Sequence, residues 1–306
     1  MDLTSPYNVT EFVLLGFTQN PYLQKILLIV FLFIFLFTML ANLLIIFTIS
    51  LSPTLSAPMY FFLTHLSFLD ASFTSVTTPK MVTDLLHQKR TISWDGCLTQ
   101  LVMENFLGGS EVIVLTVVAC DRHVAVCKPL HYTTITRQGL CQLLMVAWIG
   151  GILHAAVQIL IIVSLTFCGP NVIDNFMCDF FSLLKFACGD TYRLGIVVAA
   201  NTGVMCLLIF FLFFISYIVI LSSLKSHGSE GQYRAVSTCG SHFTIVVYIF
   251  DPCIFTHMHP VATHPVNKWV AVFFSVSSPM LNPIIYTGRN TEVKSAMRNL
   301  LKRRVT

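Results

Sequence analysis

The chain has 306 residues, of which 55% are hydrophobic and 10% charged, and its mean hydropathy is +0.77. These values exclude a soluble enzyme of ordinary composition and predict a protein surrounded by membrane lipid. The net charge of +4 is small and scattered along the chain, so we expect no nucleic-acid partner.

Residues 1–23 are polar, and we expect them to form an extracellular N-terminal tail. The tail contains Asn8-Val9-Thr10, an acceptor sequence for N-glycosylation at Asn8. No short apolar segment with a small-residue cleavage site precedes it, so we expect no removable signal peptide.

Seven apolar runs follow, each long enough for a helix to cross the hydrocarbon core. They cover approximately residues 26–51, 59–86, 98–126, 140–165, 194–224, 235–258 and 266–287. We therefore predict an all-α membrane protein whose seven-transmembrane helix bundle occupies residues 24–288. Residues 289–306 would form a cytoplasmic amphipathic tail, because an odd number of spans places the two termini on opposite sides.

Basic residues indicate the orientation. With the N-terminus outside, eleven of the 18 lysine and arginine residues lie on the cytoplasmic side. The first helix disagrees, because Lys25 flanks its start and the loop from Ser52 to Ala57 has no basic residue. The total and the sequon together favour an outer N-terminus.

The stretch 119–132 places Asp121 and Arg122 directly after an apolar run, where a helix would meet water. Two explanations fit: charges with a function, or a positive-inside flank in which Arg122 and Lys128 reach the interface. The preceding helix favours a function. At about 100° per residue, one of its faces carries Cys97, Glu104, Glu111 and Arg122.

Several acids fall inside the predicted spans. Asp70 and Glu111 lie near the middle of the second and third spans, whereas Glu104 and Asp251 lie about two turns nearer the outer side. A buried carboxylate is costly, so we expect each to be protonated, paired or in contact with a cation. A structural, hydrogen-bonded carboxylic acid is the alternative for each.

Proline interrupts several of these spans and frees carbonyl groups for neighbouring polar side chains. In the last span, the sequence Asn282-Pro283-Ile284-Ile285-Tyr286 puts Asn282 and Tyr286 one turn apart on one face. This arrangement is typical of a hinge.

Four of the ten cysteines lie on the predicted outer side, where the compartment is oxidising: Cys97, Cys168, Cys178 and Cys188. Four cysteines allow three disulfide pairings. A metal site with Asp174, Asp179 and Asp190 is the alternative, but no histidine lies within this loop to complete a soft ligand set.

From end to end, the chain resembles vertebrate olfactory receptors, a branch of the rhodopsin-like (class A) G-protein-coupled receptors. The matching pieces are Asn42, residues 58–63 (Pro-Met-Tyr-Phe-Phe-Leu), 66–70, 119–132, Trp148, the three loop cysteines, Ser216-Tyr217, 237–242 (Ser-Thr-Cys-Gly-Ser-His) and 279–286. The resemblance implies two disulfides, Cys97–Cys178 and Cys168–Cys188. It also implies a receptor rather than an enzyme.

The resemblance assigns roles in activation. Asp121 and Arg122 would form an inner lock that opens when the G protein enters, with Tyr217 and Tyr286 rearranging beside it. Asp70, Glu111 and Asn282 would form a mid-membrane cluster that can hold a sodium ion, next to Pro283. The partner would be the olfactory stimulatory heterotrimeric G protein, which raises cyclic AMP, and the location the plasma membrane of olfactory neuron cilia.

The resemblance places an odorant pocket in the outer half of the bundle. Its expected lining residues are Glu104, Asn105, Gly108, Gly109, Asn201, Asp251, Cys253, Ile254 and His257. The two adjacent glycines leave room for a small molecule, but close helix packing explains them as well. Glu104 with Asp251 suits a cationic or hydrogen-bond-donating ligand.

Several positions depart from the family pattern, among them Ala41, Gly288 and Thr291. His123 stands where the family has tyrosine, Asp251 where it has glycine, and Asn175 where it has histidine. The departure at His123 leaves open a receptor with deficient coupling. The other alternative is a non-olfactory class A receptor for a small amine or peptide.

Overall fold

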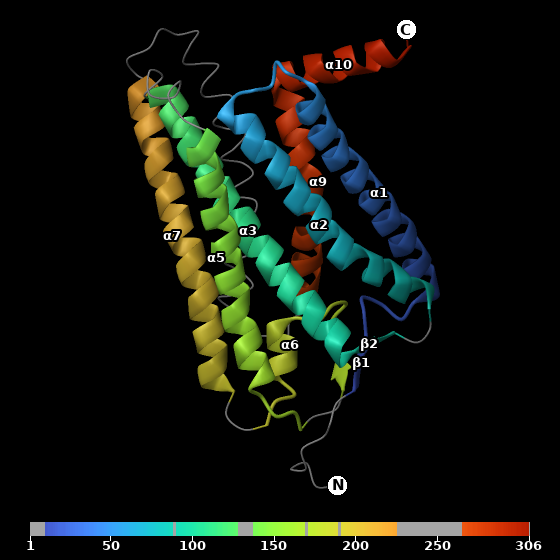
Figure 1. Ribbon diagram of the computed structural model, residues 1–306. Coiled ribbons are helices and arrows are strands. Elements are labelled where there is room, and N and C mark those ends of the chain that lie inside the picture. The colour runs from blue at the N-terminus through green and yellow to red at the C-terminus, as the bar shows by residue number, and fades with distance from the viewer. Residues whose placement is uncertain are drawn as a thin grey trace.

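A computed structural model describes residues 10–87, 90–127, 137–168, 171–188, 191–224 and 265–305. Within these ranges, six long helices run along one another as a bundle (Figure 1). They are α1 (Pro21–Leu51), α2 (Pro58–Leu86), α3 (Trp94–Cys127), α5 (Arg137–Val163), α7 (Tyr192–Leu224) and α9 (Pro265–Arg289). Each matches a predicted span, and the remaining predicted span, 235–258, lies outside the described residues.

The described helices differ in how apolar they are. Four contain segments long and apolar enough to cross a membrane: Pro21–Leu51, Trp94–Asp121, Gln138–Val163 and Tyr192–Ser216. The helices α2 and α9 are of similar length but carry more polar side chains, which they bury against their neighbours. The buried polar side chains include Ser67, Asp70 and Thr74 of α2 and Ser278 and Asn282 of α9. Together with α3, these two helices supply most of the buried polar side chains among the described residues.

Local sequence signals set where the first helices begin. Asn20 precedes α1 in an extended conformation, and its side-chain oxygen accepts a hydrogen bond from the backbone N–H of Tyr22 at 2.9 Å. Proline occupies the first position of both α1 and α2, where its missing N–H costs no helical hydrogen bond. The boundaries of these two helices thus follow from ordinary capping chemistry.

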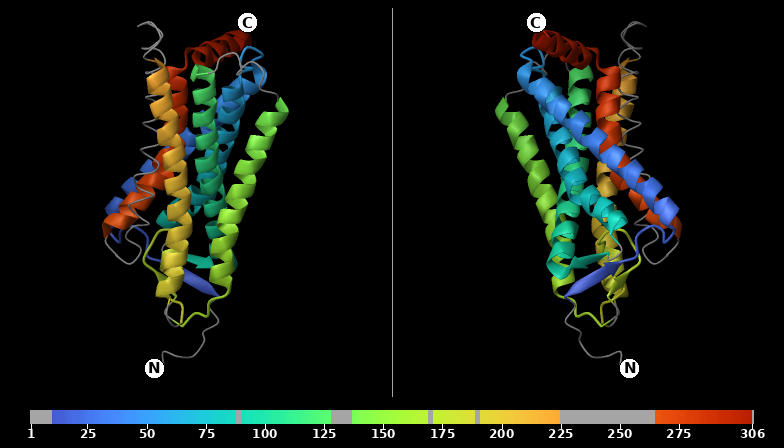
Figure 2. Two further views of the ribbon diagram at one scale, coloured as in Figure 1. Left: turned by 90° about the vertical axis from the view of Figure 1, so that its left-hand side faces the viewer. Right: turned by 90° about the vertical axis from the view of Figure 1, so that its right-hand side faces the viewer.

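A three-stranded sheet covers one end of the bundle (Figures 1 and 2). Its central strand, β1 (Glu11–Leu14), pairs antiparallel with β2 (Thr91–Ser93) and parallel with β3 (Val172–Ile173). Phe12 and Leu14 of β1 are fully buried in an apolar cluster that also contains the short helix α6 (Phe180–Leu184). Sequence analysis predicted only helices, and it missed this sheet.

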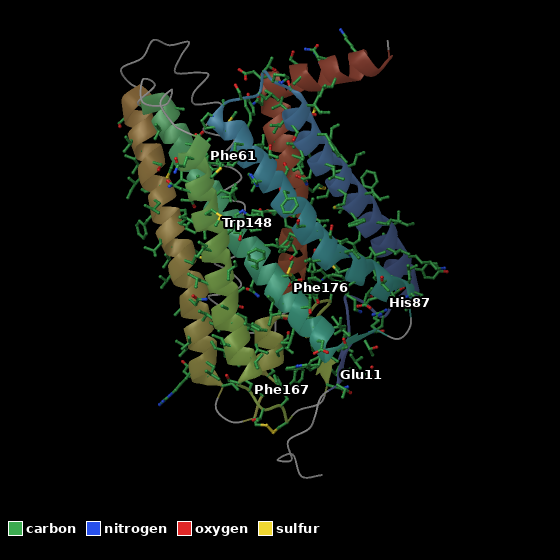
Figure 3. All side chains as sticks on the ribbon, in the orientation of Figure 1. Glu11, Phe61, His87, Trp148, Phe167 and Phe176 are labelled. Atoms are coloured by element: carbon green, nitrogen blue, oxygen red, sulfur yellow. A yellow bond between two sulfur atoms is a disulfide. The ribbon has the colours of Figure 1, made fainter. Side chains whose placement is uncertain are left out.

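The helix α10 (Thr291–Val305) lies across the opposite end of the bundle (Figures 1 and 2). Its Val293 and Ala296 are buried against Ile45 and Ile49 of α1 and Tyr60 of α2. The sheet and α10 therefore mark the two ends of the molecule. Figure 3 shows Glu11, Phe167 and Phe176 near the sheet and Phe61 in the other half.

Candidate functional site

Two disulfides fix the end of the bundle that carries the sheet. Cys97 near the start of α3 bonds to Cys178, and Cys168 bonds to Cys188, with Cα–Cα distances of 5.4 and 5.3 Å. These are the pairings that the family resemblance implied. Because all four cysteines are used, the alternative of a metal site has lost its sulfur ligands.

Backbone hydrogen bonds beside the disulfide also hold together the two ends of the loop between Cys168 and Cys188. The N–H of Cys168 donates to the carbonyl of Phe186 at 2.8 Å, and the N–H of Cys188 donates to that of Thr166 at 2.7 Å. Within the loop, Asn175 donates to the Asp179 carboxylate at 2.6 Å. The departure at Asn175 thus provides an internal loop contact.

A polar cluster joins three helices in the middle of the bundle. The side-chain nitrogen of Asn282 in α9 donates to both carboxylate oxygens of Asp70 in α2, each at 3.1 Å. The same nitrogen lies 3.3 Å from Oε1 of Glu111 in α3, which also accepts from the hydroxyl of Ser278 at 3.3 Å. Asp70 and Glu111 are 0% and 7% exposed. Two buried acids therefore share one amide donor.

A fourth helix reaches this cluster through a proline. Pro283 has no N–H, so the carbonyl of Pro279, one turn earlier in α9, lacks its helical donor. The side chain of Asn42 in α1 donates to this carbonyl at 3.0 Å. This contact agrees with the expectation that proline frees a carbonyl for a polar neighbour.

The charge of the cluster sets its chemistry. Among the described residues, no lysine or arginine lies within ion-pair distance of Asp70 or Glu111. Two carboxylates in a buried site need a proton or a cation to be stable together. Carboxylate, amide and hydroxyl oxygens are the ligands that a hard cation prefers, so Asp70, Glu111, Ser278 and Asn282 fit a small cation as well as a shared proton.

Glu104 lies about two turns from this cluster along α3, toward the sheet. Its Oε1 is buried and has no hydrogen-bond partner among the described residues. Its neighbour Asn105 donates to the carbonyl of Leu101 in the same helix at 2.8 Å. Glu104 is therefore the predicted pocket residue that still has an unused acceptor.

The side chain of Asn201 in α7 takes part in a contact that sequence analysis missed. Its amide nitrogen lies 3.2 Å from Nδ1 of His154 in α5, and Nε2 of His154 lies 3.2 Å from the amide nitrogen of Gln158. Both α5 residues are buried. The sequence pattern that could have indicated this contact is the pair His154 and Gln158, two polar residues one turn apart in the fourth apolar run.

The two glycines of α3 face different neighbours. A Cβ on Gly109 would lie 3.2 Å from the ring of His154 and 3.5 Å from the Cα of Gly151, both in α5. A Cβ on Gly108 would meet only Phe73 of α2, at 3.9 Å. Close packing of α3 on α5 therefore accounts for Gly109.

Other predicted site residues are described in part or not at all. Asp121 is buried in the last part of α3. Arg122, Tyr217 and Tyr286 belong to α3, α7 and α9, but their side chains are not among those described. The predicted positions outside the described residues are Asn8, Asp251, Cys253, Ile254 and His257.

Comparisons with known proteins agree with this arrangement. A sequence profile of the family described as "Olfactory receptor" matches residues 31–304. Human olfactory receptor 4A47 is 52% identical over 297 residues, which is 97% of this chain and 96% of that protein, and human olfactory receptor 4A5 is 50% identical over 98% of this chain and 95% of that protein. Mouse olfactory receptor 4B13 is 47% identical over 95% of this chain and 96% of that protein.

The fold has a counterpart among solved structures. The crystal structure of squid rhodopsin superimposes with a TM-score of 0.73 at 14% sequence identity, and the match covers 92% of this chain and 81% of that one. At this identity the match concerns the fold alone. It is the fold of a seven-helix membrane bundle.

Proposed function

Because the chain belongs to the olfactory receptor family, a family of multi-pass membrane receptors and not of enzymes, we propose that it binds small volatile molecules and activates the olfactory stimulatory G protein to raise cyclic AMP. The observation that carries this proposal is the cluster of Asp70, Glu111 and Asn282. It joins three helices by hydrogen bonds alone, beside a helix that two prolines interrupt. Because these contacts are noncovalent, they suit a switch between two states.

The orientation follows from the same proposal. The end with the sheet and both disulfides faces outside, because disulfides persist in an oxidising compartment. The end with α10 faces the cytoplasm, in agreement with the distribution of basic residues. Residues 1–23 would then be the extracellular tail, 24–288 the receptor domain and 289–306 the cytoplasmic tail. We place the receptor in the plasma membrane of olfactory neuron cilia.

The odorant pocket would lie beside Glu104, in the outer half of the bundle. A buried carboxylate oxygen without a partner costs free energy, and a ligand that donates a hydrogen bond to it recovers that cost. We therefore expect odorants that carry an amine or a hydroxyl group. Asp251 of the sixth predicted span, where the family has glycine, would add a second acid.

Activation would connect this pocket to the cytoplasmic end. A ligand that prefers the open arrangement shifts the population toward it by its difference in affinity. The cluster of Asp70 and Glu111 would hold a cation in the inactive state, and it would release the cation when α9 moves. Asp121, Arg122, Tyr217 and Tyr286 would then open to the G protein.

A cyclic-AMP reporter assay tests the proposal in cells that contain the olfactory stimulatory G protein. We expect some members of a broad odorant panel to raise the signal, and Arg122→Ala to abolish the response without loss of surface staining. Glu104→Gln should weaken amines by about tenfold or more, because a charged hydrogen bond contributes about 1.5–3 kcal/mol. If amines and alcohols stay silent while odorants without a hydrogen-bond donor activate, the expected ligand class is contradicted.

One departure favours a second candidate, a receptor with deficient coupling. His123 follows Arg122 where the family has tyrosine. His123→Tyr in the same assay separates the two possibilities. A response that appears only in the variant would assign deficient coupling to the native chain.

A further inference from the structure

One ring of the N-terminal segment lies where α1, α9 and the loop that joins α5 to α7 meet. The ring centroid of Phe17 is 5.5 Å from that of Phe31 in α1 and 4.8 Å from that of Phe176 in the loop. It is also 5.3 Å from the ring centroid of Trp269 in α9. Aromatic pairs at these distances attract one another beyond the effect of burial alone. Phe17 therefore connects three elements that are far apart in the sequence.

The three partners of Phe17 are not held equally. Phe31 and Phe176 are 5% and 2% exposed, and Phe176 lies two residues before Cys178, whose disulfide ties the loop to α3. Trp269, in contrast, is 50% exposed. The ring of Trp269 can therefore separate from Phe17 with less loss of burial than the other two rings.

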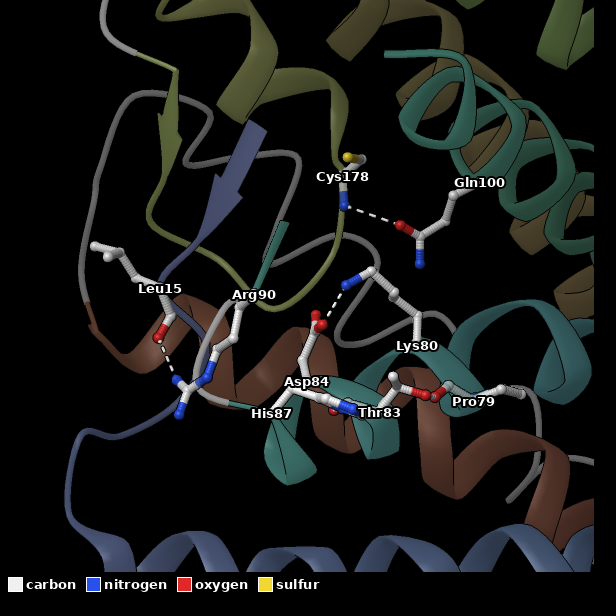
Figure 4. A network of polar contacts seen from close by, with 9 residues as sticks. All are labelled: Leu15, Pro79, Lys80, Thr83, Asp84, His87, Arg90, Gln100 and Cys178. Carbon is white, nitrogen blue, oxygen red and sulfur yellow. Dashed lines mark hydrogen bonds and ion pairs between the residues drawn. The ribbon is translucent and has the colours of Figure 1, made fainter. Parts of the chain in front are cut away.

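Backbone contacts set the position of Phe17 independently of α9. The N–H of Gly16 donates to the carbonyl of Asn175 in the loop at 3.1 Å. Nη1 of Arg90 donates to the carbonyl of Leu15 at 3.0 Å (Figure 4). Gly16 has φ +67°, and a Cβ there would lie 3.1 Å from Nη1, so glycine permits both the turn and the close approach. The segment is therefore anchored on two sides before it reaches Phe17.

A proline of α9 lies between this aromatic contact and the polar cluster in the middle of the bundle. Trp269 is about 20 Å from Asn282 along the helix axis, at 1.5 Å per residue, and Pro279 falls between them. Helices kink at proline, so the part of α9 before Pro279 can tilt against the part that follows. Val272 and Val276 of the first part are buried in the apolar cluster against which Phe17 packs. These contacts fix the angle at Pro279 and thereby support Asn282.

We propose that residues 11–17 form a clamp that opposes activation, and that the ring of Phe17 is its point of contact with α9. While Phe17 and Trp269 touch, the first part of α9 keeps the tilt that supports the polar cluster in the middle of the bundle. Activation moves α9 and separates the two rings. This inference rests on the proposed receptor function, since only a signalling receptor has an active state.

Signalling without odorant tests the clamp. We would measure cyclic AMP in the reporter cells and divide it by the amount of receptor at the surface. Phe17→Ala should raise this basal signal about two- to tenfold, because the loss of one aromatic contact shifts a two-state equilibrium by such a factor. Phe17→Tyr keeps the ring and should stay at the native level. Phe33→Ala, which removes a ring that is 69% exposed on α1, is the matched control and should stay there as well.

A double variant separates this contact from a general loss of packing. Trp269→Ala removes the same contact from the other side and should raise the basal signal by a similar factor. Phe17→Ala combined with Trp269→Ala should give no more than either change alone, because one contact can be lost only once. A basal signal that equals the product of the two single effects would contradict the clamp.

Hydrogen exchange of the purified full-length receptor in lipid nanodiscs tests the clamp without any signalling readout. In Phe17→Ala we expect faster exchange of α9 amides on both sides of Pro279, while the amides of α5 keep their native rates. A ring that only packs locally would affect the amides before Pro279 alone. The amides after Pro279 therefore distinguish a clamp from a local contact.

Three further results would overturn the proposal. They are a native basal signal in Phe17→Ala when an odorant activates both chains, an equal rise in Phe33→Ala, and faster exchange confined to α9 before Pro279. If Phe17→Ala does not reach the cell surface, Phe17→Leu replaces it, because leucine keeps an apolar side chain but has no ring. If neither the native chain nor any variant responds to any odorant, the proposed function fails, and hydrogen exchange alone decides whether the clamp acts on α9.

Discussion

The outer end of the bundle and its middle are held together by different means. At the outer end, two disulfides and a three-stranded sheet fix the loop from Cys168 to Cys188 on the start of α3. In the middle, α2, α3 and α9 meet through hydrogen bonds of 3.1–3.3 Å from one amide group. The same helix, α3, therefore has one end held by a covalent bond and a middle whose polar contacts are noncovalent, beside an apolar core that it shares with α2 and α5. A ligand that binds between these two regions can shift the polar contacts of the middle while the disulfide-linked end stays fixed.

The largest expected effect comes from breaking the fixed end. Cys97→Ser removes a disulfide that closes a loop spanning 81 residues, and such a loss costs about 2–5 kcal/mol. We expect most of this variant to be retained inside the cell, and we would measure its surface fraction by antibody staining. Cys178→Ser should behave alike. Cys141→Ser, at an exposed free cysteine of α5, should stay at the native level.

The next effect comes from breaking the middle. Asn282→Leu removes the donor that Asp70 and Glu111 share, which we expect to lower the free energy of unfolding by about 3 kcal/mol. Ser278→Ala removes a single hydrogen bond at 3.3 Å and should cost about 1 kcal/mol. Thermal unfolding in nanodiscs measures both. Equal losses in the two variants would contradict the central place of Asn282.

The sequence predicted the middle better than the outer end, for a physical reason. Long apolar runs and buried carboxylates stand out because each is costly anywhere except in a membrane bundle with a partner. The family resemblance grouped Asp70, Glu111 and Asn282, and Asn282 is within hydrogen-bond distance of both acids. The strands of two to four residues in the outer sheet carry too few side chains for a pattern of period two to be detected.

Long-range contacts escaped prediction for a related reason. The sequence does not show that His154 contacts Asn201, because the two residues are 47 positions apart. The sequence also left open whether Gly109 makes space for a ligand or for a helix, and only the position of α5 decides in favour of packing. The sequence alone also did not show that the N-terminal segment folds over Arg90 and forms a hydrogen bond with it.

A third prediction tests how tightly α3 is supported beside Glu111. A Cβ on Gly151 of α5 would lie 2.1 Å from the Ser110 hydroxyl and 2.7 Å from the carbonyl of Phe106. Gly151→Ala should therefore lower the free energy of unfolding by about 2 kcal/mol, because the backbone of α3 or of α5 must shift to make room for the methyl group. Gly203→Ala in α7 is the matched control, since no atom of the described residues would lie within 4 Å of its Cβ. Gly203→Ala should raise the free energy of unfolding by about 0.5–1 kcal/mol, because alanine is a better helix former than glycine. A loss in both variants would contradict the packing argument.

The smallest expected effect concerns the end of the bundle that carries α10, which is a third region to compare. The hydroxyl of Tyr60 in α2 donates to Glu292 of α10 at 2.5 Å and lies 3.3 Å from the side-chain nitrogen of Asn290. Tyr60→Phe removes these contacts but keeps the buried ring, so we expect a loss of about 1 kcal/mol that is confined to α10.

Hydrogen exchange measures this loss, because local opening follows local stability. Amides of α10 should exchange about fivefold faster in Tyr60→Phe, while those of α3 near Glu111 keep their native rates. Tyr22→Phe, at a side chain that is 81% exposed, is the control and should change neither. Faster exchange in both helices would mean that the cytoplasmic end and the middle of the bundle open together. The hydrogen bonds of the middle would then depend on α10 as well as on Asn282.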